Sequence, residues 1–177
     1  SPYNDIDVVI GQGTLGVELM EQMKGIDCVL APVGGGGLIA GMAMHLKAIN
    51  PAVEIIGCQP ENSPVMLRSI EAGHIIEMES LPTLADATAG GIETGSVTFD
   101  LCRELVDDFI VVTEEEILEG LRVLHLQEKV RAEGGSAMTV AALLKDGPRF
   151  TGKHVALIIS GGKVDPSVIQ RLEGGHE

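Results

Sequence analysis

Residues 27–41 read DCVLAPVGGGGLIAG, a short apolar run that passes through four glycines into a stretch of helical composition. Cys28–Val33 has the length and content of a buried strand, and Leu38–Ile49 suits a helix. Glycines let backbone N–H groups approach a ligand closely, and a helix N-terminus adds unpaired donors and the positive end of its dipole. The stretch therefore predicts an anion site, with phosphate as the natural guest. The alternative is a tight turn that binds nothing, although such a turn seldom needs Gly34–Gly37 in succession.

The composition limits the remaining possibilities. The 177 residues are predicted to form a single α/β cofactor-binding domain over residues 1–177. With 45% hydrophobic and 2% aromatic residues, the core is expected to be aliphatic. A net charge of −14 argues against nucleic acid or an anionic membrane surface as a partner. The chain shows three widely spaced cysteines, no signal peptide and no apolar run of membrane length, which indicates buried free thiols and a cytoplasmic protein.

Apolar strands alternate with helices along the chain, which predicts a three-layer α/β/α fold with a mainly parallel sheet. A second glycine-containing turn, Ser160–Gly162, follows the last strand. Ligands of such sheets bind at the carboxyl ends of strands, so the two glycine turns are predicted to line one pocket. Residues 74–96 are expected to be mostly loop. Strands are expected at Cys28–Val33, Glu54–Cys58, Phe109–Val112 and His154–Ile159, and helices at Thr14–Met23, Leu38–Ile49, Pro64–Ala72, Val97–Val106, after the Thr113–Glu116 capping box, at Ser136–Lys145 and near Asp165.

Two phosphate-bearing cofactors fit these turns. A dinucleotide would use Gly35, Gly37 and Ala40 as a G-x-G-x-x-G/A pattern, with Glu61 about twenty residues further on. A run of glycines satisfies that pattern almost automatically. Pyridoxal phosphate instead needs a phosphate cradle and a group that faces its ring nitrogen, where the Ser160 hydroxyl would leave the nitrogen unprotonated. The alternative for Ser160 is an ordinary helix or turn cap.

Further motifs accompany the two glycine turns. They are, in chain order, Ser1-Pro2-Tyr3-Asn4-Asp5, Gly11-Gln12-Gly13-Thr14, Pro32-Val33 before the glycines, Leu84-Ala85-Asp86, Val106-Asp107-Asp108, the Thr113–Glu116 helix start and Glu133. With these motifs, nearly the whole chain resembles the serine/threonine dehydratase branch of the fold-type II pyridoxal phosphate enzymes, a branch that includes serine racemase.

The resemblance implies a cofactor, a reaction and a set of site residues. The chain is expected to be the large-domain part of such an enzyme, which uses pyridoxal 5'-phosphate to convert L-threonine or L-serine to a 2-oxo acid and ammonia. The glycine run would hold the phosphate, Ser160 would bond the pyridine nitrogen, and Glu133 would lie beside the ring. Ala87 falls where the family often has glycine close to the ring. The implied cofactor-binding residues are Gly34, Gly35, Gly36, Gly37, Leu38, Ala87, Glu133, Ser160 and Gly161.

Departures from the family pattern shape the remaining expectations. None of the lysines lies in the Ser-x-Lys-x-Arg-Gly type segment that carries the family's Schiff-base lysine, and Lys163 after Ser160-Gly161-Gly162 is expected to be a surface residue. The chain therefore looks like the C-terminal part of a larger enzyme, without a catalytic residue of its own and inactive alone. Its expected partners are the amino-acid substrate, the missing N-terminal portion and further copies in a homo-oligomer.

No metal site is expected. The family's divalent cation site, where present, uses a carboxylate where this chain has Gln59, and Val65 falls where a second carboxylate would be expected. Two other functions stay open beside the dehydratase: an NAD-binding Rossmann domain, and a non-catalytic phosphate-binding or partner module. The sequence leaves the choice between threonine and serine, and between dehydration and racemisation, undecided.

Overall fold

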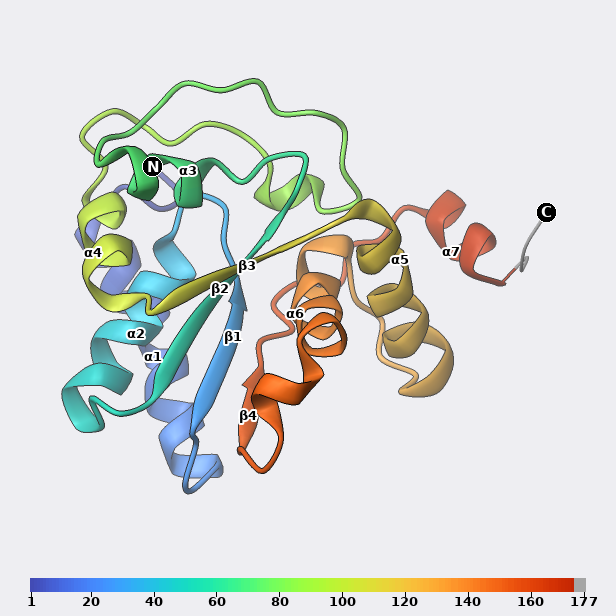
Figure 1. Ribbon diagram of the computed structural model, residues 1–177, viewed down its shortest axis with the longest axis horizontal. Coiled ribbons are helices and arrows are strands. Elements are labelled where there is room, and N and C mark those ends of the chain that lie inside the picture. The colour runs from blue at the N-terminus through green and yellow to red at the C-terminus, as the bar shows by residue number, and fades with distance from the viewer. Residues whose placement is uncertain (174–177) are drawn as a thin grey trace.

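Four parallel strands form the central sheet of the computed structural model, which describes residues 1–173 (Figure 1). The strands are β1 (Cys28–Pro32), β2 (Glu54–Pro60), β3 (Asp108–Val112) and β4 (Val155–Leu157). Their order across the sheet is β3-β2-β1-β4, and Cys28 lies opposite both Glu54 and Val155. The carboxyl ends of the strands therefore meet at one edge of the sheet, toward the top of Figure 1.

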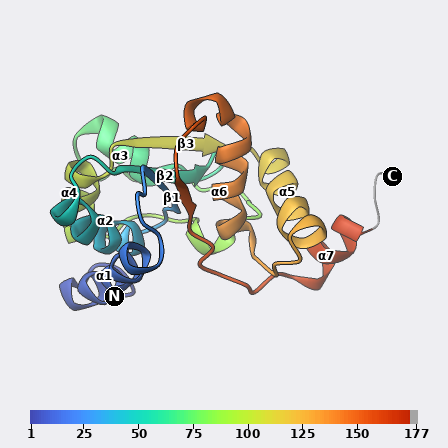
Figure 2. The same cartoon turned by 90° about the horizontal axis from the view of Figure 1, so that it is seen from below.

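Helices cover both faces of the sheet. One face carries α1 (Ile6–Gln22), α2 (Gly37–Ile49), α3 (Val65–Ala72) and α4 (Val97–Leu105), and the other carries α5 (Glu114–Arg122), α6 (Gly134–Lys145) and α7 (Pro166–Glu173). Figure 2 shows these two groups of helices on opposite sides of the strands. Shorter helical turns are η1 (Asp86–Thr88), the π-helical η2 (Val123–Gln127) and η3 (Gly147–Phe150). The predicted three-layer architecture with a parallel sheet is confirmed.

Alternating side chains along the strands divide the core in two. Val29 and Ala31 of β1 pack with the α1–α4 layer, whereas Cys28 and Leu30 pack with the α5–α7 layer. All four side chains are fully buried, as expected for a strand that is covered on both faces. The chain's three cysteines are buried and free, and burial raises the pKa of Cys102 to about 12. Such thiols are poor nucleophiles, which agrees with a purely structural role.

The first helix is longer than the predicted Thr14–Met23. Helix α1 begins at Ile6, where the Asp5 side chain accepts a hydrogen bond of 2.9 Å from the Asp7 N–H. Glycines inside α1 face α2 closely: a Cβ atom on Gly13 would lie 3.1 Å from the carbonyl oxygen of Gly41. Packing between the two helices therefore overrides the low helix propensity of glycine, and the prediction that started the helix later was wrong.

The other elements match the predictions except at their ends. The last strand, predicted over His154–Ile159, shortens to β4, which pairs only with β1. The Ile158 N–H still donates to the Leu30 carbonyl at 3.0 Å, but Pro32 has no N–H to continue the ladder. Residues 74–96 contain only η1 and are mostly loop, as predicted. Within residues 1–173, no helix combines the length and apolarity that crossing a membrane requires.

Candidate cofactor site

The candidate site lies at the carboxyl ends of β1 and β4. A cavity of about 260 Å³ opens there, and its lining includes the glycine run Gly34–Gly37, Leu38, Ala87, Glu133 and Ser160. The glycine run directly follows Val33 after β1, and Ser160 follows β4. The prediction that the two glycine turns share a pocket is confirmed through Ser160, while Gly161 lies just behind it against Glu133.

Backbone N–H groups are the main donors at this site. Gly36 adopts a left-handed conformation with a φ of 88°, which turns the chain from the strand into α2 and caps that helix. The N–H groups from Gly34 to Ile39 have no hydrogen-bond acceptor among residues 1–173, and the next N–H, of Ala40, donates to the Gly36 carbonyl at 2.9 Å. A row of free donors at a helix N-terminus is suited to an anion.

The neighbours of the glycine run explain why side chains are excluded. A Cβ atom on Gly35 would lie 2.2 Å from the Tyr3 ring, and one on Gly34 would lie 2.9 Å from the Thr88 carbonyl oxygen. Tyr3 is itself held in place, because its hydroxyl accepts a hydrogen bond of 2.9 Å from the Glu93 N–H. Tyr3 and Thr88 line the same cavity as the run, so a side chain at Gly34 or Gly35 would collide with another part of the lining.

Helix α4 holds the glycine run from behind. The buried Thr98 hydroxyl donates to the Gly35 carbonyl at 2.6 Å and bonds the Ser96 hydroxyl at 2.7 Å. The Cys102 thiol lies 3.8 Å from the Gly36 carbonyl oxygen. These contacts occupy the carbonyl oxygens of Gly35 and Gly36 and leave the N–H groups of the same residues free. The site therefore offers hydrogen-bond donors rather than acceptors to a ligand.

The second turn is fixed by α6. The Ser136 hydroxyl donates to the Gly161 carbonyl at 3.0 Å and accepts from the Gly161 N–H at 2.8 Å. The Glu133 N–H donates to the same carbonyl at 3.1 Å, and its carboxylate accepts from the Lys163 N–H at 3.2 Å. Ser160 is exposed, and its hydroxyl bonds no residue within 1–173. That freedom argues against the cap interpretation and leaves the hydroxyl available to a ligand.

The described lining carries little charge. Glu133 supplies its one carboxylate, and no lysine or arginine within residues 1–173 lines it. Lys163 instead lines a neighbouring cavity of about 140 Å³ that shares Glu133. Glu61, on which the dinucleotide alternative depends, is exposed and does not belong to the lining either. A phosphate here would be bound by N–H groups and a helix dipole, and acid–base chemistry would need groups from elsewhere.

Four contributors to this geometry were missed at the level of sequence. Tyr3 and Thr88 line the cavity against the glycines, Thr98 anchors the Gly35 carbonyl, and Ser136 anchors the second turn. Tyr3 belongs to a quoted motif, yet nothing in the sequence signalled its contact with Gly35. Thr98 and Ser136 are small polar residues that the fold buries inside helices, and Thr88 ends the short turn η1. Nothing in the sequence distinguishes these three from other small polar residues.

Comparison with known proteins identifies the class. A model of the family described as pyridoxal-phosphate dependent enzyme matches residues 1–161, so the chain belongs to that family. The glycine run suits the cofactor's phosphate because its N–H groups have no acceptor within residues 1–173. Glycine is needed at position 35 because a Cβ atom there would displace Tyr3. This membership confirms the resemblance and pyridoxal phosphate as the family's cofactor, and it rules against the NAD-binding Rossmann alternative.

Particular relatives narrow the class further. The chain is 44% identical over 171 residues to an L-threonine ammonia-lyase of Thermotoga maritima, covering 97% of this chain and 42% of the relative. It is 41% identical over 175 residues to a catabolic L-threonine dehydratase of Escherichia coli K12, covering 98% of this chain and 53% of the relative. The chain therefore spans about half the length of the curated relatives that it matches.

Solved structures give the same picture. The processed form of threonine deaminase isoform 2 from Solanum lycopersicum superposes with a TM-score of 0.90 at 32% identity, over 98% of this chain and 51% of that one. Maize serine racemase superposes with a TM-score of 0.84 at 34% identity, over 96% of this chain and 54% of that one. The fold is that of the fold-type II enzymes, as the sequence predicted.

Proposed function

We propose that this chain is the cofactor-holding part of a pyridoxal phosphate-dependent ammonia-lyase that converts L-threonine or L-serine to a 2-oxo acid and ammonia. The observation that carries the proposal is the row of free N–H groups from Gly34 to Ile39, beside a cavity that the unbonded Ser160 hydroxyl also lines. The names of the relatives, threonine ammonia-lyase and threonine dehydratase, support the reaction.

Each site residue has a proposed role toward the cofactor. Gly34–Gly37 and Leu38 would donate backbone hydrogen bonds to its phosphate, and the Ser160 hydroxyl would donate a hydrogen bond to the unprotonated pyridine nitrogen. Glu133 and Ala87 would form the surface beside the ring, and Gly161 would support Ser160 from behind. When bound, pyridoxal phosphate supplies an electron sink for the bonds at the substrate's α-carbon. The contribution of this chain is to bind and orient that group.

The site is proposed to be completed by another polypeptide portion. Ser160 and Ala87 are exposed, and β4 is an edge strand with one paired side. Since no lysine of residues 1–173 lines the cavity, the lysine that attaches the cofactor is proposed to come from a portion N-terminal to this chain in the parent enzyme. The domain over residues 1–177 would then be the large-domain part of that enzyme.

Other expectations remain proposals with partial support. An open groove of about 460 Å³ between α1 and α2 is lined by Ile10, Val17 and Met44, and exposed apolar surface of this kind supports assembly into a homo-oligomer. A substrate that is a free amino acid fits the enzymes named among the relatives. The three buried free thiols agree with a cytoplasmic location.

The test is an absorbance titration of the purified chain with pyridoxal phosphate, followed by borohydride reduction and intact-mass measurement. We expect reversible binding that inorganic phosphate competes away, and no covalent adduct. Absence of any binding would contradict the proposal that the glycine run binds the cofactor's phosphate. An adduct on one lysine of this chain would overturn the proposal that the attaching lysine lies elsewhere, and Lys163 is the first position to inspect. Ammonia release from L-threonine and L-serine by the parent enzyme tests the reaction itself.

A further inference from the structure

Gln59 is a buried amide at the end of β2, with 1% of its surface exposed. Its Nε2 donates to the Val33 carbonyl at 3.1 Å, and its Oε1 accepts from the Leu67 N–H at 2.9 Å. Val33 is the residue directly before Gly34. One side chain thus connects the start of the glycine run to the first turn of α3.

Both backbone groups of Val33 are tied to the end of β2. Its N–H donates to the Cys58 carbonyl at 2.9 Å, and its carbonyl accepts from Gln59. Helix α3 also touches the run further along, because a Cβ atom on Gly36 would lie 2.9 Å from the Met66 methyl group. The direction in which the chain leaves β1 therefore depends on the distance that Gln59 sets between Val33 and α3.

We infer that Gln59 is a positioning residue for the phosphate cradle, an inference that rests on the proposed function of the glycine run. The position requires one donor and one acceptor at the end of the same side chain. A glutamate would put a carboxylate oxygen against the Val33 carbonyl, and a methionine would leave the Val33 carbonyl and the Leu67 N–H without a partner.

The same bonds bear on the cation site that the family carries in some members. Both polar atoms of Gln59 are already used within the protein, and Val65 offers no oxygen. A neutral amide that donates toward a carbonyl does not fit a divalent cation, which prefers charged oxygen ligands. The amide thus makes the link between Val33 and α3 without a cation, and phosphate binding should be independent of added Mg²⁺.

The test compares Gln59→Glu and Gln59→Met with the unaltered chain. Each is titrated with pyridoxal phosphate and with inorganic phosphate, while the glycine amide resonances are followed by NMR. We expect both variants to bind at least about tenfold more weakly, because glutamate loses one oriented hydrogen bond and methionine loses both. The amide resonances of Gly34–Gly37 should also shift. Ser69→Ala is the matched control, because Ser69 is buried in α3, the helix that Gln59 contacts, and bonds only the Ile76 N–H, at 3.2 Å.

The outcomes separate the inference from the proposed function. If the unaltered chain binds neither ligand, the proposed function fails and the inference fails with it. If the unaltered chain binds and either folded Gln59 variant binds equally well, only the inference is overturned. If the variants do not fold, a measurement on the unaltered chain still tests the inference. The side-chain amide resonance of Gln59 should shift when inorganic phosphate is added. An unchanged resonance would contradict the link between Gln59 and the glycine run.

Discussion

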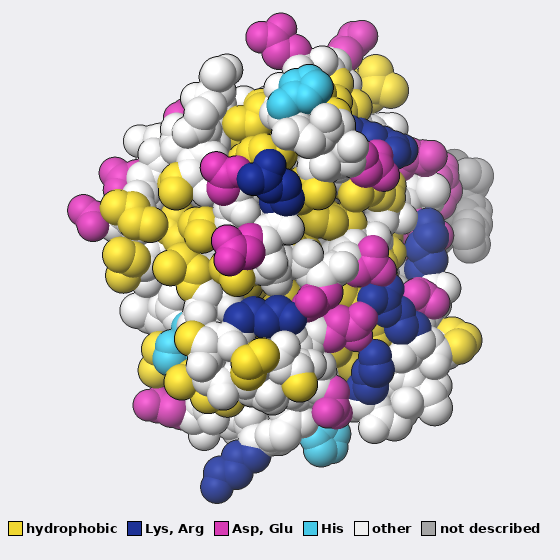
Figure 3. Space-filling model, turned by 60° about the vertical axis from the view of Figure 1, so that its left-hand side comes forward, with side chains coloured by type: hydrophobic (Ala, Val, Ile, Leu, Met, Phe, Trp, Pro, Cys, Tyr) yellow, Lys and Arg dark blue, Asp and Glu magenta, His cyan; other side chains and the backbone are white. Residues whose placement is uncertain are grey.

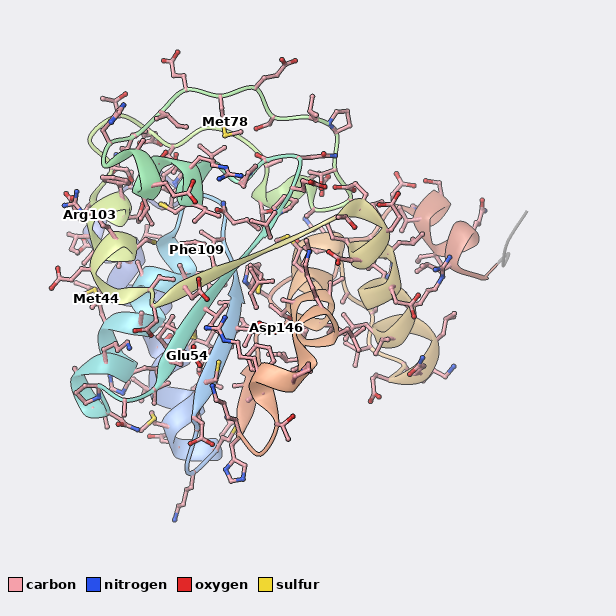
Figure 4. The ribbon with its side chains drawn as sticks, viewed as in Figure 1. Met44, Glu54, Met78, Arg103, Phe109 and Asp146 are labelled. Carbon is pink, nitrogen blue, oxygen red and sulfur yellow. The ribbon has the colours of Figure 1, made fainter. Side chains whose placement is uncertain are left out.

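The two ends of the sheet use polar groups in opposite ways. At the carboxyl end, small uncharged residues leave a row of N–H groups without partners in residues 1–173. At the amino end, Arg149 pairs with both Glu54 and Asp108, and Lys153 pairs with Glu54 at 2.8 Å. Figure 4 labels Glu54 and Asp146 in this lower region. The difference indicates that ligand binding belongs to one end of the sheet and stabilisation to the other.

Electrostatics at the amino end support that division. Burial disfavours the charged form of Glu54, but hydrogen bonds from Lys153 and Arg149 outweigh it and hold the pKa of Glu54 below its ordinary value. On the face shown in Figure 3, Lys and Arg side chains lie among Asp and Glu side chains. Paired charges of this kind join the starts of β2 and β3 to the segment between α6 and β4.

The substitution with the largest expected effect disrupts only the site at the carboxyl ends of the strands. Gly35→Val should weaken pyridoxal phosphate binding about 100-fold or more, because the side chain meets the Tyr3 ring and displaces charge-assisted N–H donors. Titration calorimetry measures the loss. Gly147→Val is the control, since Gly147 lies away from the cavity and no neighbouring group lies within 4 Å of its Cβ position. Equal affinities of the two variants would show that the glycine run does not hold the phosphate.

The glycine run illustrates what sequence alone predicts well. Strand, glycines and helix follow one another in Cys28–Ile49, and each local preference agrees with the final structure. Ser160 was placed at the same pocket because a parallel sheet brings its carboxyl ends together. These predictions needed only the order of the elements, which periodicity reveals, and no knowledge of which side chains touch.

A smaller effect is expected at the amino end. Arg149→Ala should lower the free energy of unfolding by about 1–2 kcal/mol, because it leaves Glu54 and Asp108 without their shared partner in a region where the arginine is about a quarter exposed. Denaturant unfolding measures the change. Arg68→Ala, which breaks an exposed pair with Glu71, is the control and should change it by less than about 0.5 kcal/mol. Weaker cofactor binding in Arg149→Ala would contradict the separation of the two ends.

Features that depend on contacts distant in sequence could not be predicted. The hydrogen bond from Thr98 to Gly35 joins residues on separate elements, and so do the bonds of Ser136 to Gly161. The early start of α1 depends on Gly13 meeting Gly41 across a helix pair. In each case a small residue is placed by its partner rather than by its neighbours in the chain, and sequence periodicity carries no record of that partner.

The substitution with the smallest expected effect distinguishes the role of Ser160 from that of the glycine run. Ser160→Ala should leave stability unchanged, since its exposed hydroxyl bonds no residue within 1–173. Affinity for pyridoxal phosphate should fall about threefold to tenfold, the value of one hydrogen bond to the ring nitrogen, while affinity for inorganic phosphate stays the same. Paired titrations with the two ligands measure the difference. Because inorganic phosphate has no ring, a parallel loss for both would place Ser160 in the phosphate cradle, and no loss for either would remove it from the site.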